Sequence, residues 1–215
     1  HNADRIYLIL GPRTCFPLGA GVREAVPEVL DVVRFTFKWK RLVSYGEKRF
    51  EEPDFIYADP NVFEVFSFPL AEGDPQKALQ EPLSLVITRK AAKRYFGDED
   101  PLGKILRVEN QHDYTVTGVL EEVPRNSHFH FDFLATFVGA EKVFWKEFLD
   151  HWGMGNFYTY LVLHNSSAIP EVEEKIAAAI VKPMQERNPE LGPYRPRLQS
   201  LPDIHLHSAD LKNDL

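Results

Sequence analysis

The sequence predicts an α+β fold in which two βαβ halves are separated by an inserted mixed α/β lobe. Three observations support this prediction. A strand–helix–strand pattern occurs near each end of the chain, the middle combines short helices with a hairpin, and aromatic residues make up 13% of the 215 residues, enough for a substantial core. Two βαβ halves can share one sheet in the split βαβ arrangement. We therefore expect residues 1–52 and 138–215 to form one part of the molecule and residues 53–137 to form the lobe.

The first half begins with an apolar run that is rich in strand-forming residues. Arg5–Leu10 forms this run and Gly11-Pro12 closes it, which is typical of a strand. Apolar residues at helical spacing predict a short helix over Gly19–Val29. Asp31–Lys40 alternates between apolar and polar side chains, as a half-buried antiparallel strand does. Tyr45-Gly46-Glu47 is expected to turn the chain back into a partner strand.

The middle of the chain contains several residues that are typical of helix N-termini. Asp59-Pro60 and Asp74-Pro75 each combine an N-cap residue with proline at the first helical position, so each is expected to start a short helix. Thr88 is expected to cap a third helix that runs through Tyr95. Gly97 follows where a helix commonly ends in a left-handed conformation.

Strands alternate with these helices. We expect strands at Leu83–Ile87 and Phe129–Phe133, and a hairpin formed by Ile105–Val108 and Tyr114–Leu120 around a polar turn. Gly118 inside the last of these strands predicts a bulge or a close backbone approach. The lobe should have its own small core, whose expected members are Phe63, Phe66, Leu85 and Tyr95.

The last third repeats the opening pattern. We expect an amphipathic helix over Glu141–Trp152, a strand over Tyr158–Leu163, a helix over Pro170–Lys182 that Pro183 ends, and a strand over Tyr194–Leu201. Each βαβ half has a helix with one apolar stripe, which needs a sheet to cover it. The four terminal strands should therefore share one sheet, with both of these helices packed on one face.

The charge and the motif content exclude several functional classes. The chain has 25 basic and 32 acidic residues and a formal net charge of −7, so a nucleic acid is not an expected partner. The single cysteine, Cys15, excludes an internal disulfide framework and a cysteine-based zinc cluster. The sequence has neither a phosphate-binding loop nor a Gly-x-Ser-x-Gly motif. We therefore expect no catalytic, cofactor-binding or metal-ligating residues and no cofactor.

Both ends of the sequence look cut. It starts with HNADRIY, without Met or a signal peptide, and it stops in the polar stretch SADLKNDL. Its longest apolar runs are far shorter than the roughly 20 residues of a membrane helix. We expect a fragment of a longer protein, with one apolar stretch of about 20 residues before His1 and another after Leu215.

Histidines offer the clearest candidates for a metal site. They form two His-x-His pairs, His128/His130 and His205/His207. In a strand, residues i and i+2 point to the same face, so each pair could present two imidazoles to one metal ion. A third ligand would have to come from elsewhere, such as His112 or Asp132. The spacing constrains little, and solvent-facing histidines near strand ends are the favoured interpretation.

Two charged segments also have competing interpretations. The segment GDEDP, Gly97–Pro101, lacks the alternate-ligand spacing of a helix–loop–helix calcium site, and a helix end followed by a turn accounts for it. A basic stretch could meet a membrane surface or an acidic partner, although a solvated strand face is the more common explanation. Its residues are Lys38, Lys40, Arg41, Lys48 and Arg49.

Three segments carry motifs that are specific in combination and in order. They are FIYADPNVFEVFSFPLAEGDPQKAL, LVITRKAAKRYFGDEDPLGKILRV and YTVTGVLEEVPRNSHFHFDFLATF. Together they resemble the MacB-like periplasmic core domain of FtsX-type ABC transporter permeases. The opening HNADRIY and the closing LQSLPDIHLHS are similar to the edges of that domain, so the resemblance covers nearly the whole chain.

The resemblance implies a domain at the periplasmic face of the cytoplasmic membrane, between the first two transmembrane helices of a permease. It implies a porter-like part formed by 1–52 and 138–215, with 53–137 as the inserted lobe. It also implies mechanotransmission, in which a cytoplasmic ATPase subunit or domain drives motions of the external domain. The implied partners are that ATPase through the parent permease, a periplasmic adaptor, a lipoprotein or a peptide substrate, and a second permease subunit in a membrane dimer. The family offers no catalytic residues, so the chain is not expected to be an enzyme.

Two alternatives stay open from the residues alone. A free-standing extracytoplasmic metal-dependent hydrolase would need a metal bound at the histidine pairs. A periplasmic solute-binding or adaptor protein would be encoded without flanking membrane helices. A relay of motion would instead need hinges where the lobe joins the rest, expected near residues 51–54 and 137–140, where Pro53 and Gly139 lie.

Overall fold

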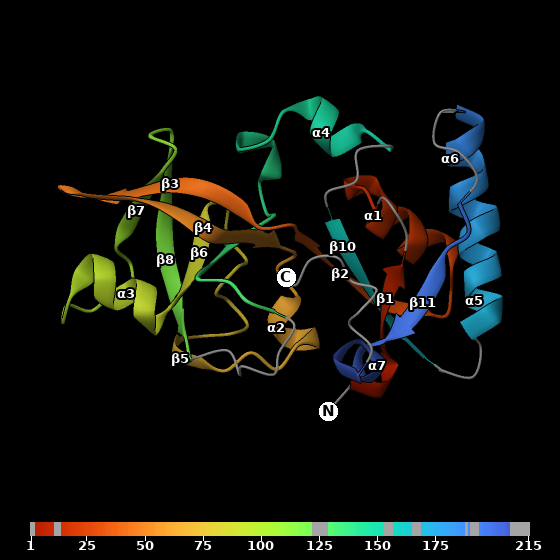
Figure 1. The fold of residues 1–215 in the computed structure, drawn as a ribbon, viewed down its shortest axis with the longest axis horizontal. Helices are drawn as coiled ribbons and strands as arrows, with labels where there is room; N and C mark the ends of the chain where they lie inside the picture. The colour runs from red at the N-terminus through yellow and green to blue at the C-terminus, as the bar shows by residue number, and fades with distance from the viewer. Residues whose placement is uncertain are drawn as a thin grey trace. The chain divides into compact units, whose positions relative to one another are not determined.

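The chain forms two compact units that both combine helices with a sheet. The structure is a computed structural model, and it describes residues 3–10, 14–121, 129–152, 157–164, 169–187, 189 and 194–206. The first unit contains the chain up to Phe35 and again from Phe144, and the second contains Thr36–Val143. Figure 1 shows helices and strands in both units, which confirms the predicted α+β class.

The sheet of the first unit contains the four strands that were expected to share it. They are β1 (Ile6–Leu10), β2 (Val29–Thr36), β10 (Phe157–Leu163) and β11 (Arg197–Ser200). Their order is β11-β1-β10-β2, and β1 is antiparallel to both of its neighbours. β10 thus lies between the two strands of the first half, and β1 lies between the two strands of the second half, as in the split βαβ arrangement. The prediction of one shared sheet is confirmed.

Two helices cover one face of this sheet. They are α1 (Phe16–Ala25) and α5 (Ile169–Ile176). One buried cluster joins apolar side chains of both helices to the alternate residues of β1 and β10 that share a face. Its central members are Tyr7, Ile9, Val22, Leu161, Leu163, Val172 and Ile176. The predicted packing of both helices on one face is confirmed.

The helix after α5 continues further than expected. A π-helical segment, Ala177–Val181, joins α5 to α6 (Lys182–Arg187), so Pro183 lies inside the continuous helix instead of ending it. Proline normally clashes with the carbonyl four residues before it. The π-helical segment ends two residues before Pro183, where the Lys182 amide donates to the carbonyl of Ala177, five residues earlier instead of four.

Several other boundaries of the first unit differ from the prediction. The strand expected over 31–40 ends at Thr36, and the last strand is replaced from Leu201 by α7 (Leu201–Leu206). The helix expected over 141–152 is divided into a 3₁₀ turn, Ala140–Lys142, and α4 (Lys146–Asp150). The extended backbone of Trp145 makes this break. The stacked rings of Phe144 and Phe148 are buried, so side-chain packing overrides the helical periodicity there.

The strands of the second unit close into a ring. In sequence they are β3 (Trp39–Tyr45), β4 (Lys48–Ala58), β6 (Ser84–Thr88), β7 (Ile105–Val108), β8 (His112–Leu120) and β9 (Phe133–Thr136). Pairing runs in the order β4-β3-β7-β8-β6-β9, and a further parallel pairing of β9 with β4 closes the circuit. A short strand, β5 (Leu70–Gly73), pairs with β8, and α3 (Arg89–Phe96) packs against β6 and β8 (Figure 1).

The hairpin of β3 and β4 belongs to the second unit, whereas we expected it with the first part of the chain. The reason is that β3 pairs with β4 along its length and also with β7. The expected hinge at residues 51–54 is consequently part of β4. Trp39 lies opposite Phe55 while Arg41 lies opposite Glu52, so Pro53 occupies a β-bulge, where a strand tolerates proline.

Local signals in the middle of the chain are partly confirmed. Thr88 caps α3 by accepting a hydrogen bond from the Ala91 amide, and Gly97 ends this helix with a φ of 68°. Gly118 follows the register shift between β8 and β6, in which Thr117 is the extra residue, and an added Cβ at Gly118 would meet Val86 at 3.3 Å. The predicted bulge thus lies directly beside Gly118.

Other expectations for the middle of the chain are wrong. The segment after Asp74 forms a turn and no helix, and the helix after Asp59 is only α2 (Val62–Val65). The strand expected over 129–133 instead begins at Phe133. Of the predicted core, Phe66, Leu85 and Tyr95 are buried, whereas Phe63 is only half-buried and Val62 takes its place inside.

Candidate functional site

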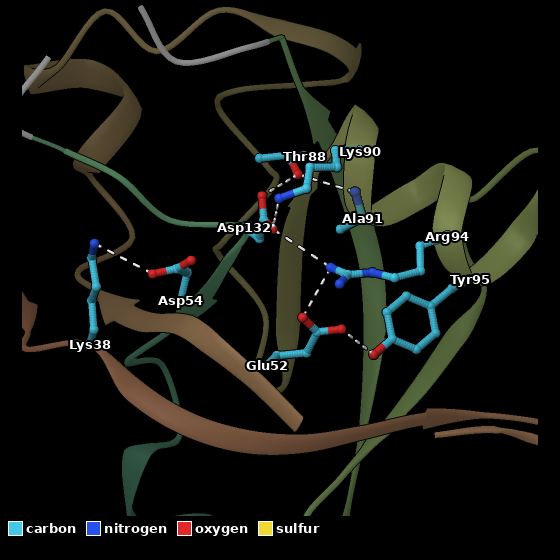
Figure 2. A network of polar contacts seen from close by, with 9 residues as sticks. All are labelled: Lys38, Glu52, Asp54, Thr88, Lys90, Ala91, Arg94, Tyr95 and Asp132. Carbon is cyan, nitrogen blue, oxygen red and sulfur yellow. Dashed lines mark hydrogen bonds and ion pairs between the residues drawn. The ribbon is translucent and has the colours of Figure 1, made fainter. Parts of the chain in front are cut away.

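A buried carboxylate is the centre of a polar network in the second unit (Figure 2). Glu52 on β4 is only 1% exposed. The Tyr95 hydroxyl donates a hydrogen bond of 2.7 Å to one of its carboxylate oxygens, and Arg94 Nη2 lies 3.0 Å from the other. Burying a charge is costly unless it is paired and hydrogen-bonded. Both partners come from α3, so the carboxylate attaches this helix to β4.

The same arginine reaches a second carboxylate, Asp132, which directly precedes β9. Arg94 Nη2 lies 3.6 Å from Asp132 Oδ2, and Lys90 Nζ lies 3.1 Å from the same oxygen. The Thr88 hydroxyl donates to Asp132 Oδ1 at 2.9 Å. The Asp132 backbone also pairs with Thr88 on one side and with Asp54 on the other. The network therefore joins β4, α3 and the start of β9.

Burial keeps the tyrosine of this network a permanent donor. Desolvation raises the pKa of Tyr95 far above its ordinary value, and the hydrogen bond to Glu52 raises it further. Arginine does not lose its proton in proteins. The hydroxyl that donates to Glu52 and the cation that pairs with it are thus retained at every physiological pH, which suits a permanent cross-link.

Among the residues that the structure describes, the predicted histidines do not form a metal site. Asp132, considered as a third ligand, is occupied by two cationic side chains. His205 lies in α7, so the same-face argument for a strand does not hold there, and His128 and His207 lie outside the described residues. Within the described ranges, no group of three or more His, Cys, Asp or Glu side chains could hold a metal ion.

The acidic segment after α3 is engaged with lysines. Lys93 pairs with Asp98 and Lys104 pairs with Glu99, and each lysine lowers the pKa of its carboxylate partner. The Asp100 carboxylate accepts a hydrogen bond from the Leu102 amide. These contacts support the interpretation of the segment as a helix end and turn.

Cys15, the single cysteine, lies in the core of the first unit and not in an open loop. It is 1% exposed, and burial raises the pKa of its thiol to about 11. A thiol nucleophile needs a lowered pKa, so the surroundings of Cys15 do not suit a reactive cysteine.

Most of the basic stretch is also paired. Lys38 lies 3.4 Å from Asp54 and Lys40 lies 2.6 Å from Glu51. Lys48 Nζ donates to the carbonyl oxygens at the end of α3. These contacts favour the interpretation of a solvated strand face over that of a membrane-binding patch.

Aromatic residues from two of the motif segments pack together. Phe66 and Phe68 from FEVFSFPL contact Phe129 from SHFHFDF at ring-centroid distances of 5.1 and 5.2 Å, and Phe68 contacts Phe131 at 5.7 Å. The geometry is edge-to-face, which aromatic pairs favour. These motif residues therefore have a structural explanation.

Sequence reasoning missed the network around Glu52 because its members lie far apart in the chain. No local pattern marks Glu52 as buried, because Phe50, two residues earlier in the same strand, is 40% exposed.

We expect Arg94→Met to destabilise the chain by about 3–5 kcal/mol, because it leaves Glu52 buried without a cation. The matched control is Arg89→Met on the same helix, which breaks the exposed pair with Glu121 and should cost at most about 1 kcal/mol. Urea unfolding of both variants gives the comparison. Equal losses would show that Glu52 does not depend on Arg94.

Comparisons with solved structures support the fold. A domain described as that of a permease protein from Porphyromonas gingivalis has 23% identity and a TM-score of 0.74, over 93% of this chain and 92% of that one. The extracellular domain of the noncanonic ABC-type transporter YknZ from Gram-positive bacteria has 14% identity and a TM-score of 0.62, over 90% and 99%. The periplasmic region of MacB from Actinobacillus actinomycetemcomitans has 14% identity and a TM-score of 0.64, over 97% and 94%.

The comparison with family models is the most specific result. No curated protein sequence gave a significant match. Among the described helices, none is long and apolar enough to span a membrane. The model of the MacB-like periplasmic core domain matches residues 9–179, which is most of the chain. The predicted resemblance is therefore confirmed, and the chain belongs to the family of MacB-like periplasmic core domains.

Proposed function

We propose that the chain is the extracytoplasmic domain of an ABC transporter permease and relays ATP-driven conformational change to a substrate or partner protein. The observation that carries the proposal is the family match over residues 9–179, on a fold shared with domains described as parts of a permease and of ABC-type transporters. The proposed location is the periplasmic face of the cytoplasmic membrane, within an integral membrane permease.

The construction of the second unit supports a relay. Its strands close into a ring, and the Glu52 network fastens α3 to that ring. A body with these cross-links transmits a displacement better than a set of loops does. The chain enters this unit near Thr36 and leaves it near Val143, so the two connections at these points are the proposed places where motion passes.

The proposed partners follow from the same role. The sequence has no phosphate-binding loop, so ATP would be hydrolysed by a cytoplasmic ATPase subunit or domain that acts through the parent permease. On the periplasmic side, an adaptor, a lipoprotein or a peptide substrate would respond to the motion. A permease dimer in the membrane would bring two such domains together.

We expect the purified chain to contain no stoichiometric zinc, because the proposed role needs no metal-bound water. Elemental analysis of untagged protein checks this. His130→Ala should leave the metal content unchanged, and His164→Ala, at an exposed histidine that is not a candidate ligand, is the matched control. Stoichiometric zinc that disappears in the His130→Ala variant would instead favour the metal-dependent hydrolase.

We expect a Gly-Ser insertion between Phe37 and Lys38, or between Val143 and Phe144, to uncouple transport from ATP hydrolysis in the full permease. Flexible residues at these connections would absorb the displacement, so export or signalling should fall several-fold while ATP hydrolysis continues. The matched control places the same insertion in the turn between Gly46 and Glu47, inside the second unit.

Measurements of transport and ATPase rates in reconstituted membranes distinguish the outcomes. If all three insertions leave transport at the wild-type rate and the domain stays folded, no relay passes through these connections. A solute-binding role without force transmission would then explain the data better.

A further inference from the structure

The second unit holds the segment through which the chain leaves it. This exit connection, residues 137–143, follows β9 and includes the 3₁₀ turn Ala140–Lys142. The Phe137 amide continues the pairing of β9 with β4 by donating a hydrogen bond of 2.9 Å to the Ala58 carbonyl. Phe137 and Ala140 are both buried. The connection therefore begins as part of the ring and not as a free linker.

A threonine hydroxyl attaches the exit connection to the turn before β6. Thr136, the last residue of β9, is buried. Its hydroxyl donates a hydrogen bond of 2.6 Å to the Leu79 carbonyl and accepts one of 3.0 Å from the Val138 amide. Leu79 is fully buried, so water cannot replace the hydroxyl at its carbonyl without a rearrangement. One side chain thus joins the end of β9, the start of the connection and the turn.

A glycine in the exit connection lies against the same turn. Gly139 has a left-handed backbone, with a φ of 70° and a ψ of 29°, and it precedes the 3₁₀ turn. A Cβ atom at this position would lie only 2.9 Å from Cβ of Pro82, which is closer than side chains approach one another. Glycine is therefore required at this position both for its backbone angle and for its contact with Pro82.

This turn, residues 78–83, is itself fixed to the ring. Leu83 has a φ of 58°, a conformation that leucine rarely adopts and that persists only where the surroundings impose it. Its carbonyl accepts a hydrogen bond of 2.9 Å from the Thr115 amide of β8. The Thr117 hydroxyl, also on β8, donates to the Ala78 carbonyl. Both ends of the turn are thus held by β8.

We propose that residues 78–83 act as a latch that fixes the exit connection to the second unit. The connection then moves rigidly with this unit, and bending is confined to the residues after Val143. Gly139 lies where the sequence suggests a hinge, but a hinge residue must be free to change its backbone angles, and the contact with Pro82 prevents this. The latch itself does not depend on any function, whereas its role in the relay rests on the proposed function.

Hydrogen exchange tests the latch in the 215-residue chain. We expect Thr136→Val to accelerate exchange of the Val138 amide about tenfold under native conditions, because this amide loses its acceptor. The matched control is Thr159→Val. Thr159 is also a buried strand threonine, but its hydroxyl has no hydrogen-bond partner among the described residues, so Val138 should exchange at the wild-type rate. An unchanged rate in Thr136→Val, or equal acceleration in both variants, would overturn the latch.

A pair of glycines separates the contact with Pro82 from backbone strain. Gly139 and Gly103 have similar φ values, 70° and 75°, but an added Cβ at Gly103 would have nothing within 4 Å. Alanine is strained at both positions, and only Gly139→Ala also meets Pro82. In urea, we expect the unfolding equilibrium constant to rise about tenfold more for Gly139→Ala than for Gly103→Ala. Equal changes would contradict the contact on which the latch depends.

The full permease tests the role of the latch in the relay. Thr136→Val should lower transport several-fold while ATP hydrolysis continues, and Thr159→Val should transport at the wild-type rate. Wild-type transport by Thr136→Val, together with faster exchange at Val138, would overturn this role of the latch and leave the proposed function standing. If the insertion between Val143 and Phe144 also leaves transport unchanged, the proposed function fails, and the exchange rates still decide whether the latch exists.

Discussion

The second unit depends on one constraint: β4 must pair with β3 on one edge and with β9 on the other. The β9 pairing is parallel and joins Phe55 to Phe133, residues far apart in the chain. Such contacts carry a loop-closure cost that local hairpins avoid. The stacked rings of Phe55 and Phe133 and the polar network at Glu52 both lie along this junction and stabilise it. Closure of the ring, and with it the position of α3, follows from this pairing.

The polar network has a clear physical role at this junction. A buried ion pair adds little stability compared with apolar packing, but it is strongly unfavourable when one partner is missing. The Glu52 carboxylate has its partners only when α3 lies where Arg94 and Tyr95 reach it. The Asp132 carboxylate reaches Arg94 only when β9 is paired in this register. The network thus selects one arrangement of these elements. The proposed relay would need such a defined arrangement more than it would need a reactive group.

The features that the sequence predicts correctly depend on interactions between residues close together in the chain. Thr88 and Gly97 determine the two ends of one helix. The alternation in β2 and the split βαβ order follow from the spacing of apolar residues. Long-range packing explains the failures. Phe129 alternates with polar residues as in a strand, yet its ring packs on Phe66 and Phe68 before the ladder begins. Pro183 lies inside a helix whose hydrogen-bond pattern changes in the π-helical segment just before it, which the apolar periodicity does not indicate. The Glu52 network combines residues that no local pattern relates.

Native-state hydrogen exchange measures the central claim, closure of the ring, most directly. If the ring is closed, the amides of β4, β6 and β9 exchange only when the whole second unit unfolds, so their exchange free energies converge on one value as denaturant is added. The account predicts this convergence. Amides of β9 that exchange at a much lower free energy, while the β3–β4 hairpin stays protected, would contradict it, because β9 would then be a detachable edge strand.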